Sequence, residues 1–184
     1  HCRKGVLLHD GHPFTAHDVL FSYKAMCDPK TPTAYADPFL QIKDARIIDD
    51  FTFEVTYKSP FAPALESWSL SILPEHLLKG RDIVKSELSR HPIGTGPYMF
   101  HSWESGAKIV LQSNHKYFEG RPFINTYVYR VIPDSATMFL ELQSGTIDRM
   151  GLTPLQYQRQ TETTYFKSNF AKYRQVPFAY THLG

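Results

Sequence analysis

Three histidines gather around one predicted turn, and imidazole nitrogen is a common ligand for zinc and similar metals. His9 and His12 flank the turn built by Gly11 and Pro13, and His17 falls in the first turn of the helix expected next. Nitrogens spaced in this way would converge on one ion only by chance. We therefore interpret these side chains as surface histidines that solvate a turn, and we predict no metal site.

Other patterns that could support catalysis have simpler structural interpretations. The adjacent acids Asp49 and Asp50 suit a hairpin turn better than general acid–base work. Gly94-Thr95-Gly96 is half of a dinucleotide-binding fingerprint, but Pro97 follows where that motif would enter a helix. The sequence has no phosphate loop, zinc-protease pattern or nucleophile elbow. We predict that the protein is not an enzyme and uses no cofactor.

The two cysteines, Cys2 and Cys27, form neither a close metal-binding pair nor a disulfide framework. A single bridge between them stays open, although two unpaired thiols fit the spacing better. Cys2 lies beside His1 and Arg3, but neither cysteine has a neighbour that clearly activates it.

Composition restricts the partners. The 184 residues are 42% hydrophobic and 14% aromatic, enough for one or two compact units with a core. Because 20 basic and 18 acidic residues are spread along the chain, giving a net charge of +2, we expect neither nucleic acid nor anionic membrane as partner. No apolar stretch approaches the roughly 20 residues of a spanning helix. The start, His1 to Lys4, resembles the middle of a strand, so we expect a longer parent protein in which an export signal could precede it.

The elements needed to position these residues follow from periodicity and punctuation. A helix begins at the Thr15 cap, with Asp18 three residues on, and ends at Asp28-Pro29. Alternation over 51–57 predicts a strand paired with 42–48. Further strands are expected over 1–8, 98–103, 108–113, 127–132 and 170–183. Further helices are expected after Pro60 and Pro63, after Pro74, over 82–89, over 136–143, where Gly145 ends the helix, and over 153–161. This mixture predicts an α/β or α+β fold with a mixed β-sheet.

Two ordered segments resemble a known family. The first runs from Arg3-Lys4-Gly5-Val6 through Asp10-Gly11-His12-Pro13-Phe14-Thr15-Ala16-His17-Asp18-Val19 to Phe21-Ser22-Tyr23. The second is Gly94-Thr95-Gly96-Pro97-Tyr98, followed by Trp103, Asn114, Tyr117, Gly120 and Pro122, with a weaker third at Pro133-Asp134 and Ser144 to Asp148. Together they are similar to the family 5 solute-binding proteins of ABC importers, which include oligopeptide and dipeptide receptors. Leu8, Phe118 and Thr146 depart from the usual family residues, which affects the subfamily more than the family.

The resemblance implies part of a periplasmic-binding-protein type II-like fold. Residues 1–92 would form most of an accessory domain and 93–184 part of the first ligand-binding lobe, while the second lobe is absent from this chain. The parent protein would be a monomeric, non-catalytic receptor that closes around a peptide by hinge motion and delivers it to the permease subunits of an ABC importer. The family places it in the periplasm or otherwise outside the cytoplasm, and lipid anchoring of the full-length protein stays open.

Candidate ligand contacts also come from the resemblance. Tyr35 follows Asp28-Pro29-Lys30-Thr31 at the spacing where peptide-binding relatives place a pocket tyrosine, with a loop-packing role as the alternative. The loop around Leu152 and the terminal segment with Phe178 and Tyr180 are expected to approach the cleft, with core packing as the alternative. A receptor for a nickel or metal chelate, haem or oligosaccharide, or a solute-sensing domain of a regulator, remains an alternative function, and a hydrolase is the least favoured.

Overall fold

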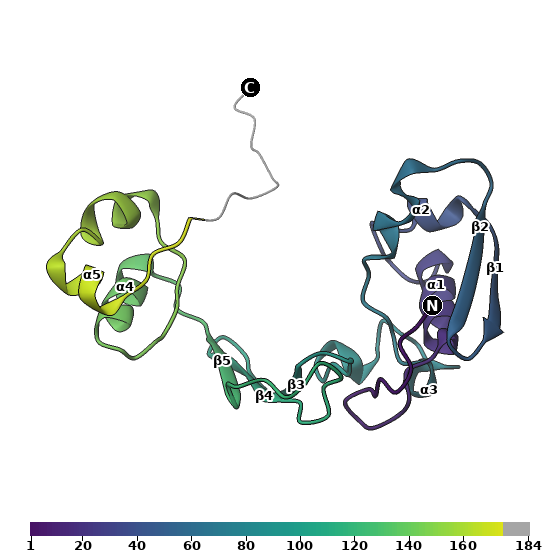
Figure 1. The fold of residues 1–184 in the computed structure, drawn as a ribbon, viewed down its shortest axis with the longest axis horizontal. Helices are drawn as coiled ribbons and strands as arrows, with labels where there is room; N and C mark the ends of the chain where they lie inside the picture. Colours follow the sequence, from purple (N-terminus) through teal and green to yellow (C-terminus); the bar gives the residue numbers. More distant parts are fainter. Residues whose placement is uncertain (175–184) are drawn as a thin grey trace. The chain divides into compact units, whose positions relative to one another are not determined.

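A computed structural model describes residues 1–174, which form parts of two compact units, His1–Arg130 and the residues from Val131 onward (Figure 1). We describe each unit by itself. The predicted boundary between 92 and 93 concerns the lobes of a larger receptor and stays a prediction. Among residues 1–174, no helix is both long and apolar enough to cross a membrane.

The first unit is organised around helix α1, Ala16–Cys27. The Thr15 side chain accepts the His17 N–H at 3.3 Å, and the Asp18 carboxylate accepts the Thr15 N–H at 2.9 Å, so that both ends of a capping box are formed. The helix ends at its C-cap Asp28, because Pro29 follows. The sequence-based prediction for this helix is confirmed at both ends.

A β-hairpin packs against α1 (Figure 1). Strands β1 (Ile42–Asp49) and β2 (Thr52–Tyr57) are antiparallel, with Ala45 opposite Val55 and Ile47 opposite Phe53. The Asp49 carboxylate accepts the Phe51 N–H at 2.8 Å across the turn, which is the local role expected of an Asx turn. The turn interpretation of the acid pair is therefore confirmed.

An aromatic cluster closes the other end of the hairpin. Two short 3₁₀ turns, η1 (Ala62–Ala64) and η2 (Glu66–Trp68), replace the continuous helix predicted after Pro60. The Trp68 ring lies 5.3 Å from Phe39 and 5.2 Å from Phe53 between centroids, and its Nε1 donates to the Tyr57 hydroxyl at 3.1 Å. Phe39 comes from the short helix α2, Asp37–Leu40. The Trp68 ring therefore packs on aromatic neighbours while its indole N–H has a hydrogen-bond acceptor.

Polar side chains of α1 bind the backbone of residues 73–75, which are distant in sequence. Ser22 and Asp18 are 2% and 3% exposed, and they accept the backbone N–H groups of Leu73 at 2.7 Å and Glu75 at 3.0 Å. Glu75 begins helix α3, Glu75–Leu78, which opens after Pro74 as predicted. One buried carboxylate therefore caps the first turn of two helices.

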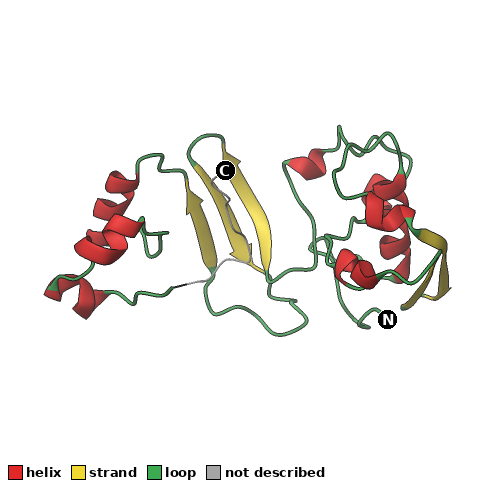
Figure 2. Cartoon of the chain, turned by 90° about the horizontal axis from the view of Figure 1, so that it is seen from above, coloured by secondary structure: helices red, strands yellow, loops and turns green. Residues whose placement is uncertain are grey.

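The rest of the first unit contains a three-stranded antiparallel sheet in the order β3-β4-β5, drawn in yellow in Figure 2. Its strands are β3 (Tyr98–Glu104), β4 (Lys108–Ser113) and β5 (Thr126–Arg130). These strands confirm the three predicted ones to within two residues at each end. Phe100 lies opposite Leu111, and a register shift follows before Ser102 pairs with Val110.

The second unit has a small apolar core. Helix α4 (Ser135–Gln143) is capped by Asp134, which accepts the Thr137 N–H at 2.7 Å, and Gly145 follows the helix at φ +76°. A π-helix, η4 (Gln156–Gln160), and helix α5 (Thr164–Asn169) complete the described part. Phe139, Leu142 and Phe166 are buried together between α4 and α5.

Besides the helix expected after Pro60, two expected elements are wrong, and a third is described only in part. Residues 1–8 form a single bridge between Leu7 and Pro13, because Gly5 turns the chain at φ +76°. The charged helix over 82–89 is a series of turns ending in the 3₁₀ turn η3 (Glu87–Ser89), since Asp82 captures the N–H groups of Val84 and Lys85. Residues 170–174 are not a strand, and the remainder of the expected strand over 170–183 lies outside the described residues.

Candidate functional site

Tyr35, the first candidate ligand contact, lies on a firmly held loop. Asp28 accepts the Lys30 N–H at 2.8 Å, and the Thr33 hydroxyl accepts the Tyr35 N–H at 3.1 Å while donating to Met26 Sδ at 3.4 Å. The tyrosine ring itself is 74% exposed. An exposed ring does not fill a core, so the loop-packing alternative has little support. A contact between Tyr35 and ligand stays a prediction.

Leu152, the second candidate, is in a different environment. It is partly buried against the Phe139, Leu142 and Phe166 core of the second unit. Ile147, Met150 and Phe170 pack on the same core. The geometry therefore favours the packing alternative for Leu152, while its proposed ligand contact stays untested. Tyr35 and Leu152 belong to different compact units, so the structure assigns them to no common site.

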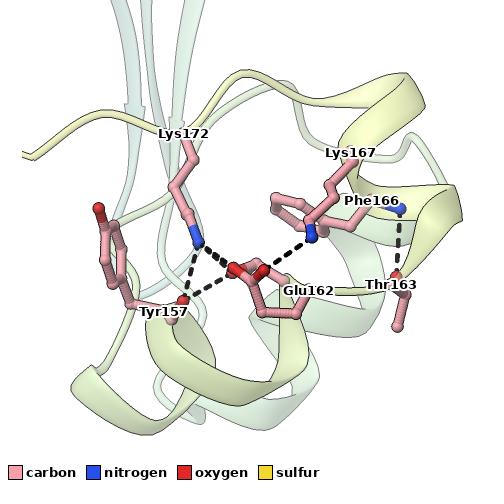
Figure 3. A network of polar contacts seen from close by, with 7 residues as sticks. Tyr157, Glu162, Thr163, Phe166, Lys167 and Lys172 are labelled. Atoms are coloured by element: carbon pink, nitrogen blue, oxygen red, sulfur yellow. Dashed lines mark hydrogen bonds and ion pairs between the residues drawn. The ribbon is translucent and has the colours of Figure 1, made fainter.

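The other two candidates, Phe178 and Tyr180, lie outside the described residues. The segment that leads toward them is anchored at Lys172 (Figure 3). Its Nζ donates to the Tyr157 carbonyl at 3.0 Å, to Thr161 Oγ1 at 3.0 Å and to Glu162 Oε1 at 2.7 Å. Lys172 therefore satisfies carbonyl and hydroxyl groups at the end of the π-helix.

Glu162 is the shared acceptor of this network, which we call the Lys172 anchor: Tyr157, Thr161, Glu162, Lys167 and Lys172. Lys167 Nζ approaches Glu162 Oε2 at 2.8 Å from the opposite side (Figure 3). Hydrogen bonds from Lys167 and then Lys172, with their charges, lower the pKa of Glu162 from 4.5 to about 2.

The three histidines of the predicted turn each contact different partners. His12 stacks on His76 with ring centroids 4.0 Å apart, and His76 Nε2 lies 2.7 Å from Asp10 Oδ2. Partial burial would raise the pKa of Asp10, but hydrogen bonds from the His12 N–H and His76 lower it overall. His17 faces Asp50 at 3.7 Å. Within residues 1–174 no three metal-ligating side chains are grouped for an ion.

His9 has contacts that sequence reasoning missed. Its Nδ1 accepts the Gly94 N–H at 3.2 Å, and its Nε2 lies 3.0 Å from the Gly96 carbonyl. The His9 backbone N–H also donates to the Gly94 carbonyl at 2.9 Å. We call residues 94–96 the glycine loop. Sequence reasoning interpreted Gly94-Thr95-Gly96 as a turn, and nothing in its residue types pointed to a contact with His9.

A cavity of about 520 Å³ lies next to the glycine loop within the first unit. Its lining is mostly apolar and comes from the turn before α1, from 70–74 and from the β3-β4 strands. Those lining residues include Leu8, His9, Phe14, Leu73, Gly94, Thr95, Tyr98, Phe100 and Leu111. Neither Tyr35 nor Leu152, the two candidate ligand contacts within residues 1–174, is part of this lining.

Both thiols, Cys2 and Cys27, are unpaired in the structure. Burial raises the pKa of each thiol, and a hydrogen bond involving Tyr23 lowers that of Cys27 only in part. Because the thiolate is the reactive form, neither cysteine is set up as a nucleophile. This agrees with the interpretation of the cysteines from sequence.

Comparison with protein families decides the classification. The profile of the bacterial extracellular solute-binding proteins, family 5, matches residues 1–184. The chain belongs to this family. The ordered motifs at Arg3 to Tyr23 and at Gly94 to Pro122 therefore carry a true relationship, and they correspond to the capped helix α1 and to the glycine loop with its sheet.

Individual relatives of this family 5 chain bind different ligands. The oligopeptide-binding protein AppA of Bacillus subtilis is 34% identical over 85% of this chain and 30% of its own length. Its structure in complex with a nonapeptide has a TM-score of 0.80 at 30% identity, covering 88% of this chain and 33% of that one. NikZ of Campylobacter jejuni, in complex with Ni(L-His), has a TM-score of 0.75 at 32% identity, over 79% of this chain and 29% of its own.

A third relative, heme-binding protein A of Haemophilus influenzae, is 28% identical over 80% of this chain and 31% of its own length. The chain thus spans about a third of the length of the relatives it matches. These likenesses show the mixed α/β fold as part of a periplasmic-binding-protein type II architecture. They agree with membership of the family 5 extracellular solute-binding proteins without naming a ligand of this chain.

Proposed function

We propose that the protein is a peptide receptor that works outside the cytoplasm and hands its ligand to the membrane permease of an ABC importer. The observation that carries this proposal is the similarity to AppA, both in sequence and in its structure with a nonapeptide bound. In this function the protein performs no catalysis. It acts as a monomer that closes around the peptide by hinge motion.

An extended peptide suits such a receptor because backbone hydrogen bonds are independent of the peptide's side chains. Side-chain specificity then falls to exposed aromatic residues with a polar tip, and Tyr35 is the candidate for this role in residues 1–174. Its ring is exposed while its backbone is fixed through Thr33, an arrangement that offers a contact at little entropic cost.

A second ligand class is supported by one specific observation. NikZ, which was solved with Ni(L-His), resembles this chain about as closely as AppA does. A metal-chelate receptor is therefore the main alternative, with haem following from heme-binding protein A. An oligosaccharide receptor or a sensor domain of a regulator stays open on sequence grounds alone.

Calorimetry on the full-length protein separates these functions. We expect saturable binding of nonapeptides from a mixed library and no saturable binding of nickel–histidine complex or haem. Tight binding of either of the latter together with no binding of any peptide would overturn the proposal. Residues 1–184 by themselves should bind peptide weakly or not at all, because one side of a cleft provides only part of the contacts.

Tyr35 provides the residue-level test. Tyr35→Ala in the full-length protein should weaken peptide binding about tenfold, and Tyr35→Phe should fall between the two if the hydroxyl takes part. Phe123→Ala is the matched control, because Phe123 is a fully exposed ring that no prediction connects with ligand. Equal affinities of wild type and Tyr35→Ala would remove Tyr35 from the site.

A further inference from the structure

We propose that His9 is a protonation-sensitive clasp, whose neutral imidazole binds the Gly94 N–H and so tightens the glycine loop against the turn over residues 8–13, and which releases that N–H when Nδ1 gains a proton. His9 lies 85 positions before Gly94 and 87 positions before Gly96 in the sequence, so the contact is long-range. It also lies where the chain passes from the α1 region into strand β3. The inference does not depend on the ligand of the receptor.

The hydrogen bonds select one state of the ring. Because the Gly94 N–H donates to Nδ1, this nitrogen must present its lone pair and carry no proton. Because Nε2 faces the Gly96 carbonyl, which is only an acceptor, Nε2 must carry the proton. The neutral tautomer with Nε2–H satisfies both contacts at once.

The imidazolium form cannot make the same two bonds. A proton on Nδ1 would set two N–H groups against each other at the Gly94 contact, which removes a hydrogen bond and leaves the Gly94 N–H without its acceptor. The Gly96 contact survives, because Nε2–H still donates, and Asn114 Nδ2 supports the same carbonyl at 3.1 Å. Acid therefore frees the Gly94 N–H, while the Gly94 carbonyl keeps its bond from the His9 backbone N–H at 2.9 Å and the Gly96 carbonyl keeps its own contacts.

Other charged groups near the clasp are occupied elsewhere. Asp10, the next residue, is turned to His76, and His91 packs edge-on against Phe100 with ring centroids 5.3 Å apart. Tyr98 is the other titratable side chain in the lining of the neighbouring cavity. The titratable groups on the segments around the clasp are Asp10, His12, His76, His91, Tyr98, His115 and Lys116. Histidine is the side chain that ordinarily changes charge between pH 5 and 8.

Release of the Gly94 N–H weakens one contact in the wall of the cavity. His9, Gly94 and Thr95 all line it, together with apolar side chains from 70–74 and from β3 and β4. Opening the clasp would loosen the loop that connects the predicted accessory domain with the strands of the ligand lobe. The receptor would then change its local stability at this junction when its compartment becomes acidic.

The test combines ring tautomer and local opening in the full-length protein. At pH 7.5 the ¹⁵N signals of the His9 ring should report the Nε2–H tautomer. The hydrogen-exchange protection factor of the Gly94 amide should fall about fivefold between pH 7.5 and pH 5, the loss expected for one hydrogen bond. Ring signals of an Nδ1–H tautomer at pH 7.5 overturn the proposal.

Two variants make the exchange result specific. In His9→Gln, the side-chain amide donates to the Gly96 carbonyl and accepts the Gly94 N–H, so Gly94 should keep equal protection at both pH values. His115→Gln, at an exposed histidine, should retain the fivefold fall of the wild type. A fall that persists in His9→Gln, or its absence from the wild type, contradicts the clasp. If His9→Gln does not fold, the wild-type tautomer and protection still decide.

Discussion

The two compact units differ in the kind of contact that joins distant segments inside each of them. In the first unit, segments far apart in sequence are joined by side chains that bind backbone groups: Ser22 to Leu73, Asp18 to Glu75, and His9 to the glycine loop. In the second unit, helices α4 and α5 share a core of Phe139, Leu142 and Phe166.

The difference shows how each unit obtains its specificity. An apolar core tolerates exchange of similar side chains, because burial of hydrocarbon is not directional. A buried carboxylate with two N–H partners tolerates almost no replacement, because an unmade hydrogen bond leaves a desolvated group. We therefore expect the polar joints of the first unit to depend on residue identity and the α4–α5 core of the second on residue volume.

The largest effect should come from the core of the second unit. Phe166→Ala removes a ring that is 3% exposed, and it should lower the free energy of unfolding by about 4 kcal/mol, whereas Phe166→Leu should cost much less. Denaturation followed by fluorescence measures both. Leu140→Ala on the exposed side of α4 is the control and should change little. Similar losses for Phe166→Leu and Phe166→Ala would contradict volume dependence.

The next effect concerns the shared cap in the first unit. Asp18→Ala leaves the N–H groups of Thr15 and Glu75 without their acceptor and should cost about 3 kcal/mol of unfolding free energy. Asp18→Asn keeps the volume and one acceptor oxygen, so it should still lose about half of that amount. Urea unfolding compares the two. An Asn variant as stable as the wild type would show that shape rather than charge and acceptor number decides here.

The smallest effect should come from the exposed Lys172 anchor. The pKa of Glu162 is lowered to about 2, so its contribution is present above the ordinary value of 4.5 and is lost as the pH falls toward 2. Lys172→Met should raise the pKa of Glu162 while Lys167 still holds it below 4.5. Carboxyl ¹³C titration by NMR reads this directly. An unchanged titration of Glu162 in Lys172→Met would mean that the anchor does not hold in solution.

Much of the fold was predictable where the determinants are local. The Thr15 and Asp18 capping box defined the start of α1, and alternation with an acidic turn defined the β1-β2 hairpin. Prediction was wrong where a side chain competes for the backbone. Asp82 captures two N–H groups and prevents a helix that charge and propensity favoured.

Less of the candidate site was predictable, because its contacts are non-local. Nothing in the sequence around His9 indicates that its ring reaches Gly94, because the two residues lie 85 positions apart. Leu152 was selected for its place in a loop, but its packing depends on Phe139 and Phe166, which periodicity alone does not pair with it. The position of Tyr35 came from family resemblance, and its exposure could not be derived from spacing.

The double role of Asp18 also bears on the order in which the first unit folds. Its bond to Thr15 spans three residues and can form as soon as α1 nucleates, while its bond to Glu75 spans 57 residues and must wait for the intervening hairpin. The carboxylate would therefore speed helix formation early and slow unfolding late. The folding and unfolding rates of Asp18→Asn would show how much of the lost stability comes from contacts formed before the transition state and how much from contacts formed after it.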